Sequence, residues 1–198
     1  MKRLIIFVSL IYPLVCHSQG MEKVKTYKEF MACVAQEKLG LHEIMNYPVL
    51  FPVKRNDYTS FVNSKFGKRN HPVYKVVRNH TGVDIAEPKG TPVYSAGNGK
   101  IVKTGYNKGY GYYIEVEHSH KFVTLYGHLS KILVKKGQQV VCGEHIGNVG
   151  STGVSTGPHL HYEVKKNGIY LNPEDWCYCL MKILEEIKKK QAENYAEL

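Results

Sequence analysis

The chain has 198 residues, a formal net charge of +10 at pH 7 and 43% hydrophobic residues. This length allows one domain with a sizeable buried core. The basic charge favours an anionic polymer as partner, but the sequence contains no helix-turn-helix, zinc-finger or RNA-binding signature, so we do not expect nucleic acid to be that partner.

Residues 1–18 are typical of an export signal. Two basic residues at positions 2 and 3 precede an apolar stretch that runs from Leu4 to Val15, and Ser18 is a small residue suited to cleavage. The stretch is too short to cross a bilayer comfortably, which takes about 20 apolar residues. We expect an exported chain in the periplasm or cell envelope, cleaved after Ser18. Because no second apolar run follows, we expect no transmembrane anchor in the mature chain.

Lipid attachment at Cys16 is an alternative to cleavage after Ser18. It is less favoured because Val15, just before the cysteine, is large. Export also permits disulfides, but the sequence cannot pair the four cysteines that would remain. Cys177 and Cys179 are expected on a helix, where residues two apart do not face each other, so we interpret them as free or packed thiols.

Residues 19–52 are expected to form a helical N-terminal segment. Apolar residues recur at helical spacing between Glu22 and Leu39, and Gly40 is a natural C-cap. Pro48 and Pro52 mark a turn into the main domain, which we place at residues 53–173.

Short strands separated by turns dominate residues 53–173. Residues 113–116 and 122–125 are predicted to form a hairpin through residues 118–121, with His118 and His120 as exposed turn residues. The pattern predicts a mainly β fold, a small antiparallel sheet of barrel or sandwich type with flanking N- and C-terminal helices. The glycine-rich stretches 105–111 and 150–153 lack the features of phosphate loops and are interpreted as turns.

The segment 174–198 is predicted to be a helix. Asn172 can cap it, Pro173 stands where proline is tolerated, and two acidic residues follow in the first turn. Apolar residues form one stripe along it, which we expect to pack on the domain: Trp176, Leu180, Ile183, Leu184 and Ile187.

Histidine motifs carry the chemistry of this sequence. His80 stands four residues before Asp84, a carboxylate with apolar neighbours on both sides, and burying such a group is costly unless it is paired or bound to a metal. His159 and His161 would share one face of a strand, and His128 stands between the two motifs. Two histidines and one aspartate make a three-ligand zinc site with a fourth position open for water, which is the catalytic pattern.

The chain resembles the lysostaphin-type (LytM-type) zinc endopeptidases, which cut the peptide cross-links of peptidoglycan. The similarity runs from about Phe61 to about Pro173 and rests on many ordered motifs: Phe66-Gly67-Lys68-Arg69, His71-Pro72, His80 to Asp84, Gly90-Thr91-Pro92-Val93, Gly109-Tyr110-Gly111, Leu125 to Leu129, Lys136-Gly137-Gln138, Gly147 to Gly150, and Ser155 to His161.

The resemblance implies a role for each of these histidines. It implies that His80, Asp84 and His161 bind one zinc ion per chain, and that His128 and His159 are catalytic without being ligands. Tyr74 is a candidate to help hold the oxyanion, with Tyr94, Tyr110 and Tyr126 as alternatives.

The expected function is hydrolysis of peptide cross-links in bacterial peptidoglycan, with stem peptides as the partner. The sequence shows no appended targeting module of the kind that pentaglycine-cutting relatives often carry, which favours a D,D-endopeptidase. The alternatives are an envelope regulatory or binding protein on the same fold with little turnover, and a glycyl-glycine peptidase.

Overall fold

The structure is a computed structural model, and it describes residues 27–35, 40–54, 62–70 and 76–196. The predicted signal peptide, Cys16 and Tyr74 lie outside these ranges. None of the helices in the described part of the chain has the length and apolar character needed to span a bilayer.

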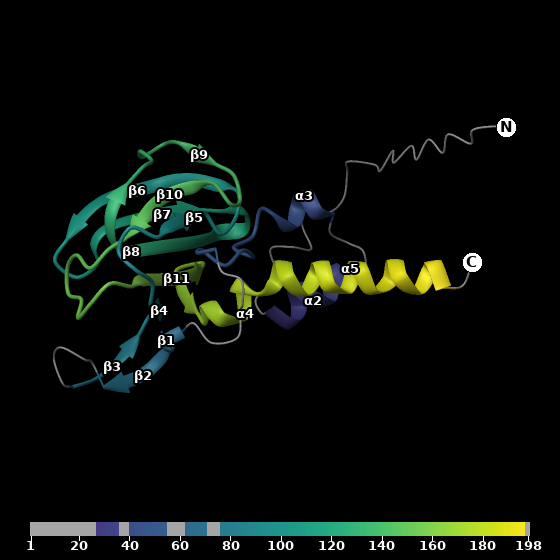
Figure 1. Ribbon diagram of the computed structural model, residues 1–198, viewed down its shortest axis with the longest axis horizontal. Helices are drawn as coiled ribbons and strands as arrows, with labels where there is room; N and C mark the ends of the chain where they lie inside the picture. Colours follow the sequence, from purple (N-terminus) through teal and green to yellow (C-terminus); the bar gives the residue numbers. More distant parts are fainter. Residues whose placement is uncertain (1–26, 36–39, 55–61, 71–75, 197–198) are drawn as a thin grey trace.

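Strands are the commonest secondary structure of the described chain, as the sequence predicts (Figure 1). In chain order they are β1 (Val62–Ser64), β2 (Gly67–Asn70), β3 (Val77–His80), β4 (Val83–Ile85), β5 (Pro92–Tyr94), β6 (Gly99–Asn107), β7 (Gly111–Glu117), β8 (Phe122–Ile132), β9 (Gln139–Val140), β10 (His145–Val149), β11 (Leu160–Lys166) and β12 (Ile169–Leu171). The helices are α2 (Tyr27–Ala35), α3 (Leu41–Ile44), α4 (Pro173–Cys177) and α5 (Cys179–Ala196), and a 3-10 turn, η1 (Ser119–Lys121), joins β7 to β8.

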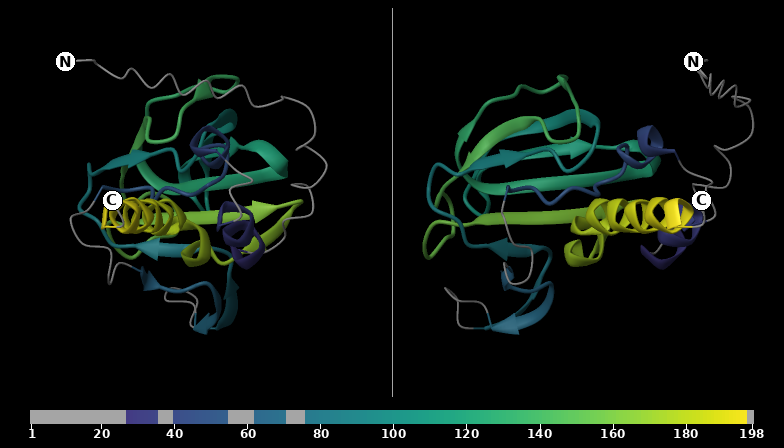
Figure 2. Two further views of the ribbon diagram at one scale, coloured as in Figure 1. Left: turned by 90° about the vertical axis from the view of Figure 1, so that its right-hand side faces the viewer. Right: turned by 45° about the vertical axis from the view of Figure 1, so that its right-hand side comes forward.

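Ten strands form one large sheet, in which the main order is β1-β4-β11-β8-β7-β6-β9. β10 pairs with both β5 and β8, β12 pairs with β11, and every pairing is antiparallel. β2 and β3 form a separate two-stranded hairpin. Figures 1 and 2 show this hairpin set apart from the sheet on the side of β4, while α5 extends away from one end of the sheet. The mainly β, antiparallel prediction is confirmed.

β11 lies between β4 and β8 and has both faces covered. Because side chains alternate along a strand, its apolar and polar residues lie on opposite faces. Leu160, Tyr162 and Val164 are fully buried in the hydrophobic core. His161 and Glu163 therefore lie on the opposite face, which is the face that carries the polar site.

The predicted hairpin between residues 113–116 and 122–125 is present, with Val116 opposite Thr124. The expectation that His118 is an exposed turn residue is wrong, because its side chain is buried. Its Nδ1 lies 2.8 Å from the Asn98 carbonyl, and its Nε2 lies 2.8 Å from the Thr124 hydroxyl. His120 is half-buried and stacks on Tyr47 at 5.1 Å between ring centroids.

The C-terminal segment forms two helices instead of the single predicted one. Asn172 caps α4 as predicted, accepting a hydrogen bond from the Glu174 backbone nitrogen at 3.2 Å. The helix is interrupted at Tyr178, whose ring stacks on Phe51 at 5.7 Å. The expected packing of this segment is seen at Ile183 and at Trp176, which is buried against Phe122. Leu184, predicted in the same stripe, is exposed.

The N-terminal segment also packs on this end of the sheet. Phe30 of α2 is fully buried and contacts Trp176, with ring centroids 5.6 Å apart. Gly40, expected to end a helix, stands at the start of α3, where its carbonyl accepts hydrogen bonds from Glu43 and Ile44. Cys177 and Cys179 are buried free thiols, as interpreted from the sequence.

Candidate metal centre and catalytic groove

The register between β4 and β11 places Asp84 directly beside His161. The His161 Nδ1 atom lies 2.9 Å from Asp84 Oδ1. Val83 and Ile85, on either side of Asp84, are buried, so the alternation of the strand turns the carboxylate to the opposite face. Two residues that are 77 positions apart in sequence are thus held together by backbone pairing.

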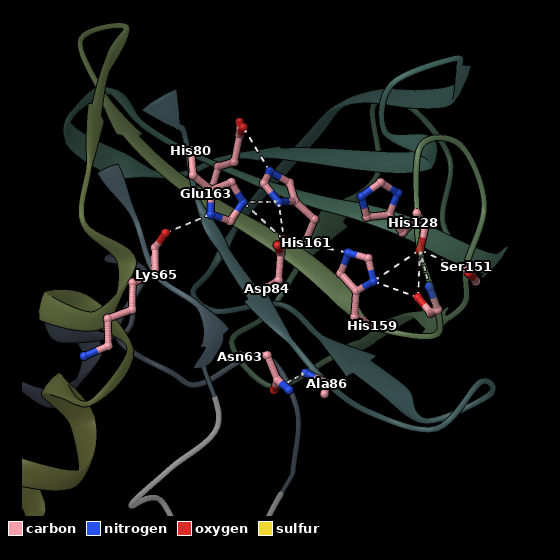
Figure 3. Close-up of polar contacts among 12 residues, drawn as sticks. Asn63, Lys65, His80, Asp84, Ala86, His128, Ser151, His159, His161 and Glu163 are labelled. Carbon is pink, nitrogen blue, oxygen red and sulfur yellow. Dashed lines mark hydrogen bonds and ion pairs between the residues drawn. The ribbon is translucent and has the colours of Figure 1, made fainter. Parts of the chain in front are cut away.

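His80 completes a cluster of three donor atoms. It ends β3, and its Nε2 atom lies 3.2 Å from Asp84 Oδ1 and 3.2 Å from His161 Nδ1. The three side chains converge in Figure 3. Among the described residues, His80, Asp84 and His161 are the group of His, Cys, Asp and Glu side chains whose geometry could hold a metal ion.

The outer nitrogens of both histidines are occupied by acceptors of the protein. His80 Nδ1 lies 2.9 Å from the Lys65 carbonyl, and His161 Nε2 lies 3.1 Å from Glu163 Oε1 (Figure 3). An imidazole that donates its N–H outward keeps a lone pair on its other nitrogen. In both rings the other nitrogen faces Asp84, and a metal ion bound there would take the place of the proton shared with the carboxylate and leave both rings as neutral ligands.

Glu163 contacts the Nε2 atom of His161, on the side of the ring away from Asp84. It was missed in the sequence analysis. It is fully buried and accepts hydrogen bonds from Thr81 and from the Tyr110 hydroxyl, the latter at 2.8 Å. Lys165 forms an ion pair with its other oxygen at 3.2 Å. Burial raises the pKa of Glu163, but the hydrogen bond and charge of His161 outweigh burial and lower that pKa to about 2. The signal that would have found Glu163 is its position two residues after His161, on the same strand face.

Asp84 is held on both of its oxygens. Oδ1 faces the two histidines, and Oδ2 accepts a hydrogen bond from the Arg69 guanidinium at 2.9 Å. Burial raises the pKa of Asp84, but hydrogen bonds from His161 and His80 overcome this and hold the pKa well below its usual range. The carboxylate is therefore ionised and aimed at the centre of the cluster. Arg69 was predicted only as part of a motif, with no role of its own.

His128 and His159 lie beside the cluster with their rings 4.6 Å apart. Each uses Nδ1 to donate to a backbone carbonyl, at 2.7 Å to Thr152 and at 2.8 Å to Gly157 respectively. Nε2 of His159 lies 3.7 Å from Asp84 Oδ1. Burial lowers the pKa of His128 to about 4, so its ring is neutral at pH 7. The neutral His128 ring thus keeps a lone pair on Nε2.

The loop that carries Thr152 is held by close backbone approaches. A Cβ on Gly150 would lie 2.4 Å from the Ser130 nitrogen, and one on Gly153 would lie 2.3 Å from the Gly111 nitrogen. Gly153 also has a φ of +75°, which L side chains rarely adopt. The glycine-rich stretch around residue 150 is therefore a turn that positions the partner of His128, in agreement with its interpretation as a turn.

A groove of about 370 Å³ is lined by all five predicted site residues, His80, Asp84, His128, His159 and His161. Its lining also includes Arg69, Arg78, Tyr110, and the loop that includes Ser155 and Thr156. Of the tyrosines considered from the sequence, Tyr110 lines the groove, whereas Tyr126 is fully buried in the core. Tyr94 lies outside the groove and packs near His145.

The donor set fits a zinc ion. Four-coordinate zinc with bonds of about 2.0–2.1 Å needs ligand atoms separated by roughly 3.3 Å, and the three donor atoms here lie 2.9–3.2 Å apart. Two neutral imidazoles and one carboxylate, open on the groove side, are the donor set of catalytic rather than structural zinc sites. This fold and this donor set define the class of metallohydrolases built on a β-sheet.

Known proteins with similar sequences and structures identify the family within this class. Residues 78–173 match the sequence profile of Peptidase family M23. The catalytic domain of lysostaphin from Staphylococcus simulans superimposes with a TM-score of 0.53 at 34% identity, covering 58% of this chain and 90% of that domain. The chain belongs to peptidase family M23.

Two further relatives come from Vibrio cholerae. The peptidoglycan DD-endopeptidase ShyC of serotype O1 is 46% identical over 113 residues, which make up 57% of this chain and 26% of ShyC. A zinc-containing peptidase of known crystal structure has a TM-score of 0.56 at 43% identity, covering 62% of this chain and 37% of that one. The chain thus spans about a quarter of the length of the curated relative.

Proposed function

We propose that this chain is a zinc-dependent endopeptidase that hydrolyses peptide cross-links of bacterial peptidoglycan, with D,D-endopeptidase specificity. The observation that carries the proposal is the convergence of His80, Asp84 and His161 at the floor of a groove that His128 and His159 also line. The similarity to ShyC, a relative named as a peptidoglycan DD-endopeptidase, supports the substrate.

His80, Asp84 and His161 would hold the zinc ion in this proposal. Zinc would supply a Lewis acid that lowers the pKa of water and polarises a carbonyl group. The outward hydrogen bonds to Lys65 and Glu163 fix the orientation of both rings, so that the nitrogen facing Asp84 can bind the metal.

His128 and His159 would move protons. Each has its Nδ1 proton held by a carbonyl, so Nε2 can accept a proton from the attacking water and return it to the leaving amine. The low pKa of His128 keeps its ring unprotonated at neutral pH. Tyr110, tied to Glu163, would hold the back of the His161 ring, with which it stacks at 5.5 Å.

The proposal extends to where the chain works. An export signal at residues 1–18 would deliver a peptidase domain of residues 53–173 to the periplasm or cell envelope, where cross-linked stem peptides are abundant. The net charge of +10 suits an anionic wall. Lipid attachment at Cys16 remains the less favoured alternative to cleavage.

Purified cross-linked muropeptide dimers and pentaglycine, incubated separately with the zinc-loaded protein, test the proposal. Mass analysis should show dimers converted to monomers, with no conversion by the His128→Ala variant. Cleavage of pentaglycine alone would instead indicate a glycyl-glycine peptidase. Binding to purified sacculi without turnover on either substrate would indicate a regulatory or binding protein.

A further inference from the structure

Arg69 of the β2–β3 hairpin reaches the metal centre on β4. The hairpin lies outside the ten-stranded sheet, on the side of β4 (Figure 1). Each of its strands carries one side chain that contacts Asp84. His80 Nε2 lies 3.2 Å from Oδ1, and Arg69 Nη2 donates a hydrogen bond to Oδ2 at 2.9 Å. The imidazole and the guanidinium therefore hold different oxygens of the same carboxylate.

The two oxygens of Asp84 have different surroundings. Oδ1 faces the nitrogens of His80, His159 and His161, at 3.2, 3.7 and 2.9 Å respectively. Oδ2 is bound by Arg69 in an ion pair whose side chains are only 24% and 14% exposed. A charge-assisted hydrogen bond that is partly shielded from water is stronger than an exposed one. The carboxylate is thus fixed with one oxygen toward the cluster and the other toward the hairpin.

The way in which a carboxylate binds a metal depends on whether its second oxygen is free. A carboxylate can bind a metal ion through one oxygen or through both, and the second mode takes up a further coordination position. A catalytic zinc site keeps one position for water or substrate. A guanidinium on Oδ2 competes with the metal for that oxygen, and it presents a rigid, permanently charged fork that a lysine does not.

We propose that Arg69 is a positioning residue that holds Asp84 as a single-oxygen metal ligand and so keeps a coordination position open toward the groove. The inference rests on the metal centre of the proposed function and deepens it, since it assigns control of the metal coordination to a residue outside the ligand set. Arg69 acts through Asp84 in this account, without contact to the reacting atoms.

The visible absorption of the cobalt(II)-substituted protein tests the role of Arg69. Four-coordinate cobalt absorbs severalfold more strongly than five- or six-coordinate cobalt, because a tetrahedral field mixes p character into the d orbitals most strongly. The wild type should give the strong four-coordinate spectrum. Arg69→Met keeps a long side chain but donates no hydrogen bond, so it should lose this intensity severalfold as Asp84 binds through both oxygens. Arg69→Lys keeps the charge without the fork and should lose less.

Lys68→Met is the matched control, because it removes a positive charge from the neighbouring, exposed position of β2, on the other face of the hairpin. It should keep the wild-type spectrum. Thermal melting and metal content establish that each variant is folded and loaded. Equal spectra in the wild type and Arg69→Met, or a weak spectrum in the wild type, would overturn the inference. If Arg69→Met does not fold, the comparison of the wild type with Arg69→Lys decides in the same way.

Kinetics on cross-linked muropeptide dimers separate positioning from substrate binding, a distinction that matters because Arg69 also lines the groove. In zinc-loaded Arg69→Met, kcat should fall by about 10–100-fold, the range for partners of metal ligands, while KM stays near the wild-type value. A raised KM with unchanged kcat would show instead that Arg69 binds the substrate. The cobalt spectrum needs no substrate. A wild type that binds cobalt but cleaves neither dimers nor pentaglycine would therefore contradict the proposed function and leave the test of Arg69 intact.

Discussion

Two groups of histidines lie in the same β-sheet and differ in how the protein satisfies their ring nitrogens. His118 has both nitrogens satisfied internally, by the Asn98 carbonyl and the Thr124 hydroxyl. The groove histidines each have one nitrogen fixed by an acceptor, while the other faces the site. Burial does not separate the groups, since His118 and His161 are each 5% exposed. The number of nitrogens left to the groove distinguishes a structural histidine from a functional one.

Removing a groove histidine that is not a ligand should break the activity and nothing else. His128→Ala and His159→Ala should each lower turnover on cross-linked dimers by about 10²–10⁴-fold, the range expected for loss of an acid–base group. Both should keep their zinc, because neither belongs to the three-residue cluster. Steady-state rates and elemental analysis check this. His42→Ala, at an exposed position on α3, is the control and should change neither.

Acid should destabilise the fold through His118. Burial lowers the pKa of His118 to about 4, against partial compensation by the Asn98 carbonyl. The folded state therefore resists protonation while the unfolded state accepts it near pH 6.5, so stability is full above that pH and falls between pH 6.5 and 4. A shift of this size corresponds to about 3 kcal/mol.

Urea unfolding of the metal-free protein across this pH range measures the effect. His118→Gln, which cannot titrate, should show a shallower pH dependence than wild type. An NMR titration of the wild type gives the His118 pKa directly, even if the variant folds poorly. A pKa near 6.5 would show that His118 is not held neutral by the fold.

Glu163 should affect metal affinity through His161. Glu163→Gln keeps the shape of the side chain but loses the charge that orients and polarises the His161 ring. Changes to such outer partners cost about 10–100-fold in metal affinity or activity, and chelator competition measures the zinc dissociation constant. Glu115→Gln, which loses an ion pair with Lys103 on the adjacent part of the sheet, should bind zinc as the wild type does.

The sequence predicted the features that arise from local pattern. Alternation located the hairpin of residues 113–116 and 122–125, and the same alternation is what brings His161 and Asp84 to one face. The burial of His118 was not predictable, because it depends on Asn98 and on glycines at positions 97 and 99 that are distant in sequence. Tyr178, where the C-terminal helix breaks, likewise contacts Phe51, which is distant in sequence.

The pairing of Arg69 with Asp84 lay beyond the sequence for a similar reason. It needs the β2–β3 hairpin to fold over β4, which no local pattern encodes. Glu163, in contrast, could have been predicted, since the strand argument applied to His159 and His161 extends one step further along the chain. Tertiary contacts, rather than residue types, decide the roles of His118 and Arg69.

Zinc content per chain, measured by elemental analysis of five purified proteins, tests the distinction between the two groups of histidines most directly. The wild type and His118→Gln should each bind one zinc ion. His80→Ala, Asp84→Ala and His161→Ala should bind close to none, because each removes one of the three converging donors. Full zinc occupancy in Asp84→Ala, or loss of zinc in folded His118→Gln, would contradict the account.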